Sequence, residues 1–360
     1  MKKGGWKKLL LVLLPIAVFV VFALLDPQIE DIGSVLLKID PLWLIGAFVC
    51  ILLYYLLDTT MYLLACKYMQ EPQPFKEGLI TTMIGFFYSA LTPFSSGGQP
   101  MQVLQMRKRG IKVGAATSVI MVKFLAWQLA ITVLGSVAFF FVGSDADHAS
   151  MIVLYCIGFC LYFGTVILAL LVLFKPDWVH RVGESILGFL ARRRILKRSG
   201  TLKRARQTWQ RTIKDLKTAV KFTLKHKWGM LLIFLVCLLE AVSYMSVTYF
   251  IYRGMGNTSA SFISIIMMQC FLHIAVSFIP LPGASVASEG GFYLIFSKFF
   301  LDGQRFPAMV LWRLVTYYSA LVFGAVFVVI EGIRNPRPPE GTVAELPAEE
   351  ADPPHEGAGI

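Results

Sequence analysis

Apolar runs of about twenty residues recur along this 360-residue chain, and they constrain its fold more than any other feature. A helix rises about 1.5 Å per residue, so about twenty residues cross roughly 30 Å of hydrocarbon. A composition of 56% hydrophobic and 16% charged residues is too apolar for the surface of a soluble protein. The sequence predicts an all-α polytopic membrane protein with about six full transmembrane helices. The expected spans are Leu9–Leu25, Leu42–Cys66, Val113–Val142, Met151–Phe174, Trp228–Tyr252 and Phe306–Ile330.

Two further apolar stretches are interrupted by Pro and Gly. Leu79–Leu91 is too short to cross, and Phe262–Ile279 is followed only by the short apolar stretch Phe292–Leu301. Both are predicted to form re-entrant helical hairpins that enter from opposite faces and turn near Thr92–Pro100 and Pro280–Gly291. Broken helices at membrane depth must be buried in protein or line a wet cavity, because their free N–H and C=O groups need partners. Ordinary loops between full spans remain the alternative.

Lys and Arg gather in some connecting segments and are nearly missing from others. They open the chain, cluster at residues 107–112 and dominate residues 175–227, whereas residues 26–41 and 143–149 carry almost none. Because cytoplasmic loops retain positive charge, we expect both termini in the cytoplasm. A net charge of +12 suits contact with an anionic inner leaflet, so nucleic acid is not an expected partner.

Two segments are predicted to lie outside the membrane spans. Within residues 191–227, apolar side chains at helical spacing separate faces of Arg and Lys, which predicts an amphipathic helix on the inner leaflet. A specific sensor of lipid headgroups remains an alternative for this segment. Residues 334–360 are rich in Pro, Glu, Ala and Gly, which predicts a disordered cytoplasmic tail. Residues 1–333 would then form the transmembrane domain.

Ionisable side chains within the spans and hairpins are the strongest candidates for a site. Each costs several kcal/mol in hydrocarbon unless it is paired or hydrated. They could line a cavity for a charged headgroup, or they could pair structurally, for example Glu240 with Lys123 or Glu289 with Arg313. Lys298 follows the second turn as a further charge, whereas His273 is expected to be a packed, hydrogen-bonded residue. The candidates are Asp58, Lys123, Glu240, Glu289 and Arg313.

The first predicted turn carries a second group of candidates. Gly97 and Gly98 precede a helix expected to begin near Pro100. Gln99, Gln102 and Gln105 occupy neighbouring positions on one side of that helix, where they could hydrogen bond a headgroup. The free N–H groups at a helix N-terminus favour phosphate or carboxylate.

Sequence signals for catalysis are missing. The chain has no GxSxG or HExxH motif and no acidic pair typical of glycosyltransferases, so we expect no enzyme activity. The six cysteines include no CxxC pair beside a His cluster, so we expect neither a metal nor a cofactor.

The residues around both turns resemble one known family. They read Leu91-Thr-Pro-Phe-Ser-Ser-Gly-Gly-Gln-Pro-Met-Gln102 and Ile279-Pro-Leu-Pro-Gly-Ala-Ser-Val-Ala-Ser-Glu-Gly-Gly-Phe292. This pattern is similar to that of the lysylphosphatidylglycerol synthetase transmembrane region, also called the flippase-like domain family. The resemblance covers roughly Leu9–Ile333. One departure is Ala284-Ser285-Val286, where members of the family often carry more Gly.

The resemblance implies a function and a set of site residues. In the multiple peptide resistance factor, a domain of this kind moves lysyl-phosphatidylglycerol between leaflets, and its soluble synthase domain has no counterpart here. A bacterial plasma-membrane lipid translocase is therefore expected, acting on a phospholipid, aminoacyl-phospholipid or glycolipid, with homo-oligomerisation left open. The implied substrate residues are Gly97, Gly98, Gln99, Gln102, Glu240, Glu289 and Arg313.

Two other functions remain as alternatives. A non-transporting scaffold or regulator would bind anionic lipid or a partner protein through the basic segment 191–227. A membrane-embedded lipid transferase would use the cavity for chemistry that the motifs do not reveal. Loss of function on Glu240→Gln or Glu289→Gln would favour transport, whereas loss on deletion within the basic segment would favour the scaffold.

Overall fold

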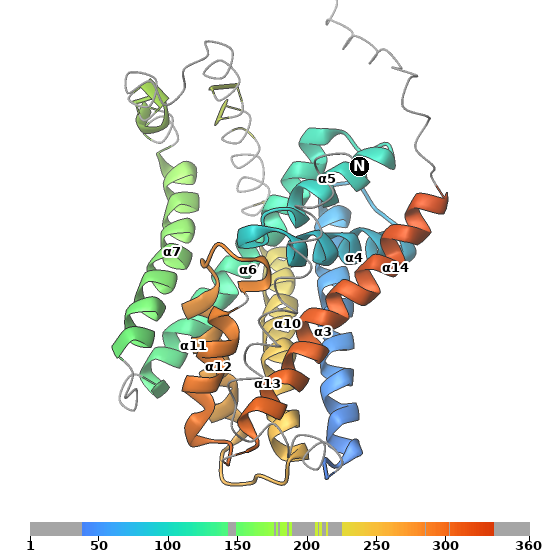
Figure 1. Cartoon of the computed structure of the whole chain (residues 1–360). Helices are drawn as coiled ribbons and strands as arrows, with labels where there is room; N and C mark the ends of the chain where they lie inside the picture. Colours follow the sequence, from blue (N-terminus) through green and yellow to red (C-terminus); the bar gives the residue numbers. More distant parts are fainter. Residues whose placement is uncertain are drawn as a thin grey trace, which may run out of the picture.

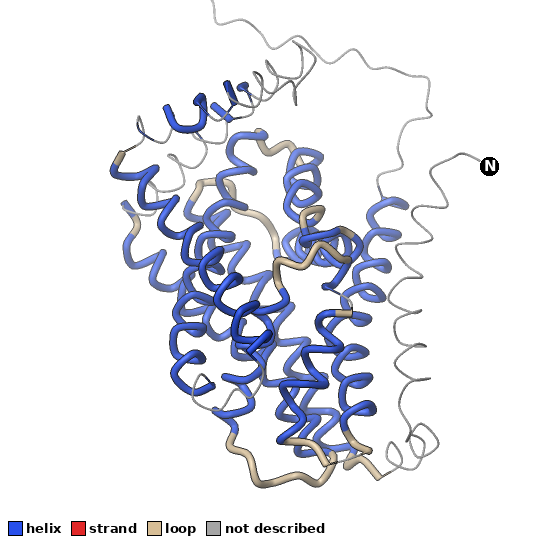
Figure 2. Tube along the Cα trace, turned by 60° about the vertical axis from the view of Figure 1, so that its left-hand side comes forward, coloured by secondary structure: helices blue, strands red, loops and turns tan. Residues whose placement is uncertain are grey.

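The computed structural model describes residues 38–142, 149–175, 225–284, 286–301 and 303–334, together with some positions between 178 and 214. The secondary structure in these ranges is helical, and no strand occurs among the described residues (Figure 2). The predicted span Leu9–Leu25, residues 335–360 and most of the basic segment 191–227 lie outside the described residues.

Within the described residues, four helices are long and apolar enough to cross a membrane. They are α3 (Pro41–Tyr68), α6 (Val113–Val142), α10 (Lys227–Gly254) and the continuous helix Arg305–Arg334. The last comprises α13 (Arg305–Arg313), a π-helical turn at Leu314–Tyr318 and α14 (Ser319–Arg334).

A fifth helix, α7 (Ala149–Phe174), covers the predicted span Met151–Phe174 and lies at the edge of the bundle (Figure 1). Exposed apolar side chains such as Phe140, Ile157 and Trp228 belong to these long helices. The chain is thus an all-α polytopic membrane protein.

The starts of two helices follow local capping rules. Pro41 occupies the first turn of α3, and the Asp40 carboxylate accepts a hydrogen bond from the Leu42 N–H at 2.9 Å. Ser261 likewise accepts from the Ser264 N–H at 3.1 Å, at the start of α11 (Phe262–Val276). These caps satisfy backbone donors that the first helical turn leaves without partners.

The two interrupted segments turn where the sequence predicts. The first consists of α4 (Phe75–Leu91), the 3₁₀ turn η2 (Pro93–Ser95) and α5 (Gly98–Lys108), and α4 lies across the direction of α3 and α10 (Figure 1). The second consists of α11, η3 (Pro282–Ala284), α12 (Ala287–Ile295) and η4 (Phe296–Lys298). At 17 and 15 residues, α4 and α11 are shorter than the long helices around them.

The two turns meet inside the bundle. η2 packs against η3, and the Tyr317 hydroxyl of the last long helix donates to the Ala90 carbonyl at 3.2 Å. Both turns hold non-glycine residues at positive φ, namely Phe94, Ser95, Ala284 and Val286. Such backbone costs energy and persists only where surrounding contacts hold it.

Val286 is the most strained of these residues, and its replacement should stabilise the protein. Its φ of 71° and ψ of −54° disfavour a β-branched side chain, which is 46% exposed and therefore contributes little burial. We expect Val286→Gly to raise the free energy of unfolding by about 1 kcal/mol, measured by thermal unfolding in detergent. Val286→Ala keeps the strained backbone, so a gain from Ala as large as from Gly would contradict the explanation.

Candidate functional site

A cavity of about 490 Å³ lies inside the helix bundle. Its walls come from both turns and from the helices α3, α4, α5, α6, α7, α10, α11, α12, α13 and α14. The fold therefore brings together polar groups from segments far apart in the sequence. The ionisable side chains that line the cavity, apart from its tyrosines, are Asp58, Lys123, Glu240, His273 and Arg313.

Three of these side chains form a charged cluster, contributed by α3, α6 and α10. The Lys123 Nζ donates to Asp58 Oδ2 at 2.5 Å. The Glu240 carboxyl group lines the same cavity as these two partners. Asp58 is 4% exposed and Glu240 is 1% exposed, so neither carboxyl is solvated by bulk water. The cavity thus holds two buried carboxyl groups near one ammonium group, which pairs with Asp58.

A second charged group joins the last long helix to the second turn. The Arg313 Nε lies 2.8 Å from Glu289 Oε1, and the Arg313 Nη2 donates to the Gly283 carbonyl at 3.2 Å. The Nε–H is not aligned with an acceptor, so the contact with Glu289 is an ion pair without a hydrogen bond at Nε. The guanidinium also lies 4.8 Å from the Trp312 ring centroid, within cation–π range. Arg313 thereby fixes the turn beside the cavity.

The beginning of α5 supplies an uncharged polar wall. Gln99 and Gln102 both line the cavity. Gln102 packs directly on Gly85 of α4, where a Cβ atom would lie 2.4 Å from its Nε2. Gly98 is equally close to α4, because a Cβ atom there would lie 2.6 Å from the Gly85 carbonyl oxygen. The small residues let α5 approach α4 closely enough to place both glutamines at the cavity.

Several uncharged residues that line the cavity were not predicted. Gln128 of α6 donates to the Thr165 hydroxyl of α7 at 2.7 Å. Gln269 of α11 accepts from Thr248 at 2.8 Å. A glutamine inside an apolar span is the signal that could have identified Gln128 and Gln269. His273 also lines the cavity, where it contacts the Tyr162 hydroxyl at 3.4 Å and agrees with the prediction of a hydrogen-bonded histidine.

Most of the predicted site residues converge on this cavity. Of the two suggested ion pairs, Glu289 with Arg313 is present, whereas Lys123 forms its ion pair with Asp58 instead of Glu240. Glu289 and Gly97 lie next to cavity residues without lining the cavity themselves, and Lys298 is exposed at the end of η4. The predicted residues that line it are Asp58, Gly98, Gln99, Gln102, Lys123, Glu240 and Arg313.

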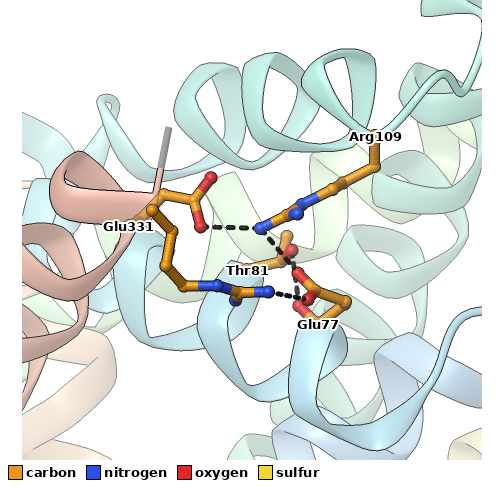
Figure 3. A network of polar contacts seen from close by, with 5 residues as sticks. Glu77, Thr81, Arg109 and Glu331 are labelled. Atoms are coloured by element: carbon orange, nitrogen blue, oxygen red, sulfur yellow. Dashed lines mark hydrogen bonds and ion pairs between the residues drawn. The ribbon is translucent and has the colours of Figure 1, made fainter. Parts of the chain in front are cut away.

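A separate ion network ties the interrupted segment to the end of the last helix (Figure 3). Arg109, just after α5, lies 2.8 Å from Glu77 of α4 and 2.7 Å from Glu331 of α14. Arg334 adds a contact of 3.0 Å to Glu77. None of the four residues lines the cavity. The network instead holds α4 and α5 at the ends opposite their turn, which the sequence could not predict because the partners are far apart along the chain.

Metal ligands do not gather in the part of the chain that the structure describes. No group of three His, Cys, Asp or Glu side chains there has the arrangement of a metal site. The polar chemistry of the cavity comes from two charged groups and from amide and hydroxyl side chains.

Comparison with known proteins places these observations in a family. A family model described as "Lysylphosphatidylglycerol synthase TM region" matches residues 7–324. A protein from Archaeoglobus fulgidus, named "UPF0104 membrane protein", is 27% identical over 313 residues. That alignment covers 84% of this chain and 90% of the archaeal protein. Residues 7–324, which the family model matches, include both interrupted segments and the ionisable residues of the cavity.

Proposed function

The chain belongs to the lysylphosphatidylglycerol synthase transmembrane-region family, and on that premise we propose that it is a lipid translocase. It moves an amphiphilic lipid between leaflets while the headgroup passes through the cavity and the acyl chains stay in the bilayer. The protein makes no covalent bond to the lipid. In this proposal it lies in a bacterial plasma membrane with both termini in the cytoplasm, and the two interrupted segments are re-entrant hairpins.

The observation that carries this proposal is a polar cavity inside helices whose outer faces are apolar. About 490 Å³ is within the size range of small-molecule sites. Buried ionisable groups in a membrane protein mark substrate or ion pathways, because their cost must be offset by pairing or hydration. Short helices that end near the centre of a bundle are also typical of transporter sites.

The residues suggest how a headgroup would be held. Arg313 provides positive charge, and Gln99 and Gln102 provide amide donors that bind phosphate oxygens at a smaller desolvation cost than a further cation. Asp58 and Glu240 provide negative charge for a cationic group on the same lipid. Glu289 acts through Arg313, because it sets the position of the guanidinium.

The test is movement of headgroup-labelled lipids in proteoliposomes, with anionic, aminoacylated and glycosylated lipids compared. Wild-type protein should move one class, and Glu289→Gln should slow it by about tenfold or more, since a charge-assisted contact contributes about 1.5–3 kcal/mol. Lys298→Gln is the matched control, because this side chain is exposed in the same segment. Both variants must unfold as cooperatively as the wild type. Movement of no class by folded wild type would refute the translocase, whereas equal rates for Glu289→Gln and wild type would refute the role given to Glu289.

A further inference from the structure

The cluster of Asp58, Lys123 and Glu240 has one more acid than base. Lys123 is the base of this cluster, and its ammonium group donates a hydrogen bond to Asp58. Glu240 Oε2 is buried and has no hydrogen-bond partner among the described residues. With all three groups ionised, the cluster would carry one uncompensated negative charge within the bundle, which is costly.

The placement of the two carboxyl groups shows how this charge can be neutralised. Glu240 and Asp58 line the same cavity, on the helices α10 and α3 that pack against each other. Ionised carboxylates only accept hydrogen bonds, so a hydrogen bond between two carboxyl groups requires a proton on one of them. Two carboxyl groups that share a site commonly hold one proton between them.

Among the described residues that line the cavity with Glu240, no other group supplies the missing positive charge. Tyr54 of α3 and Cys237 of α10 lie beside the carboxyl groups, and neither is a cation. Arg313, which lines the same cavity, is paired with Glu289. Tyr244 of α10 and His273 of α11 also line the cavity, and their rings pack on each other. The cluster is therefore balanced by one proton or by a cation that enters the cavity.

We propose that Asp58, Lys123 and Glu240 form a binding site for one exchangeable proton, which couples lipid movement to a proton gradient. This inference rests on the proposed translocase function. The proton passes from water in the cavity to a Glu240 carboxylate oxygen, forms an O–H bond that donates to Asp58, and returns to water when that bond breaks. Without the proton, Glu240 attracts a cation, so the proton and a cationic headgroup compete for the same carboxylate.

The first test detects the proton directly in the full chain, without any lipid substrate. Infrared difference spectroscopy of the purified protein should show the C=O stretch of a protonated carboxyl group near neutral pH, where exposed carboxylates are ionised. Glu240→Gln should abolish this band. Asp58→Asn should abolish it too, because Lys123 would then pair with an ionised Glu240. Glu331→Gln is the control, since this carboxyl group lies in the separate ion network.

The second test detects coupling in proteoliposomes. With one proton exchanged per lipid, a pH difference should shift the ratio of labelled lipid between leaflets roughly tenfold for each pH unit, and reversing the gradient should reverse the shift. Glu240→Gln should lose this response.

The outcomes separate the two proposals. A wild-type protein without the infrared band would overturn the proton site even if lipid moves. Lipid movement that ignores the gradient would overturn the coupling and leave the translocase intact. A wild type that moves no lipid would overturn the translocase and the coupling together, while the infrared band alone would decide the proton site.

Discussion

Arg313→Met is expected to lower the free energy of unfolding by about 3–5 kcal/mol. The variant leaves Glu289 as an unpaired charge at 1% exposure, and it removes the hydrogen bond from Arg313 to the Gly283 carbonyl. Methionine is similar in length to arginine and is apolar, so the loss comes mainly from the unpaired carboxylate. Chemical or thermal unfolding in detergent would measure it.

A double variant distinguishes this explanation from simple loss of packing. Replacing a buried ion pair by apolar residues is often close to neutral, so Arg313→Met with Glu289→Met should recover most of the lost stability. Lys108→Met, an exposed change near the end of α5, should have little effect. If the double variant is less stable than Arg313→Met alone, the unpaired charge is not the cause.

Gly98→Ala is expected to lower the free energy of unfolding by about 1–3 kcal/mol through overpacking. The added Cβ atom would lie 2.6 Å from the Gly85 carbonyl oxygen and 2.0 Å from Ser89 Oγ. The serine side chain can rotate, but the backbone of α4 has to move. Because Gln102 packs on the same part of α4, lipid movement should also slow.

Gly114→Ala in α6 is the matched control for this variant. Nothing lies within 4 Å of a Cβ atom at Gly114, so the alanine should leave stability unchanged or raise it by up to about 1 kcal/mol. Thermal unfolding of both variants measures the difference. Equal stability of Gly98→Ala and Gly114→Ala would show that α5 does not approach α4 as closely as the structure indicates.

The predicted helices were largely correct because their signal is local. The prediction Leu42–Cys66 corresponds to α3, and Trp228–Tyr252 corresponds to α10, with ends that differ by a few residues. Length and apolar composition decide whether a segment can be a spanning helix, and both are read directly from the chain. The Pro-containing turns were also found, because proline ends a helix by removing an N–H donor and by steric clash.

The candidate site was predicted less completely, since pairing depends on which helices are neighbours. The cost of burying charge identified Asp58, Lys123 and Glu240 individually. Their grouping depends on α3, α6 and α10 facing one another, which no local pattern encodes. The same reason explains why the contact of Arg109 with Glu331, 222 positions later in the chain, was missed.

The sequence by itself determined that the chain is helical, lies in a membrane and breaks two of its helices at Pro- and Gly-containing turns. These properties follow from the transfer of apolar groups out of water and from backbone geometry, which act over a few residues at a time. Only the tertiary structure decided that Lys123 pairs with Asp58, leaving Glu240 without a cation of its own. Electrostatic pairing falls off with distance in space, so it becomes defined only once the helices have packed.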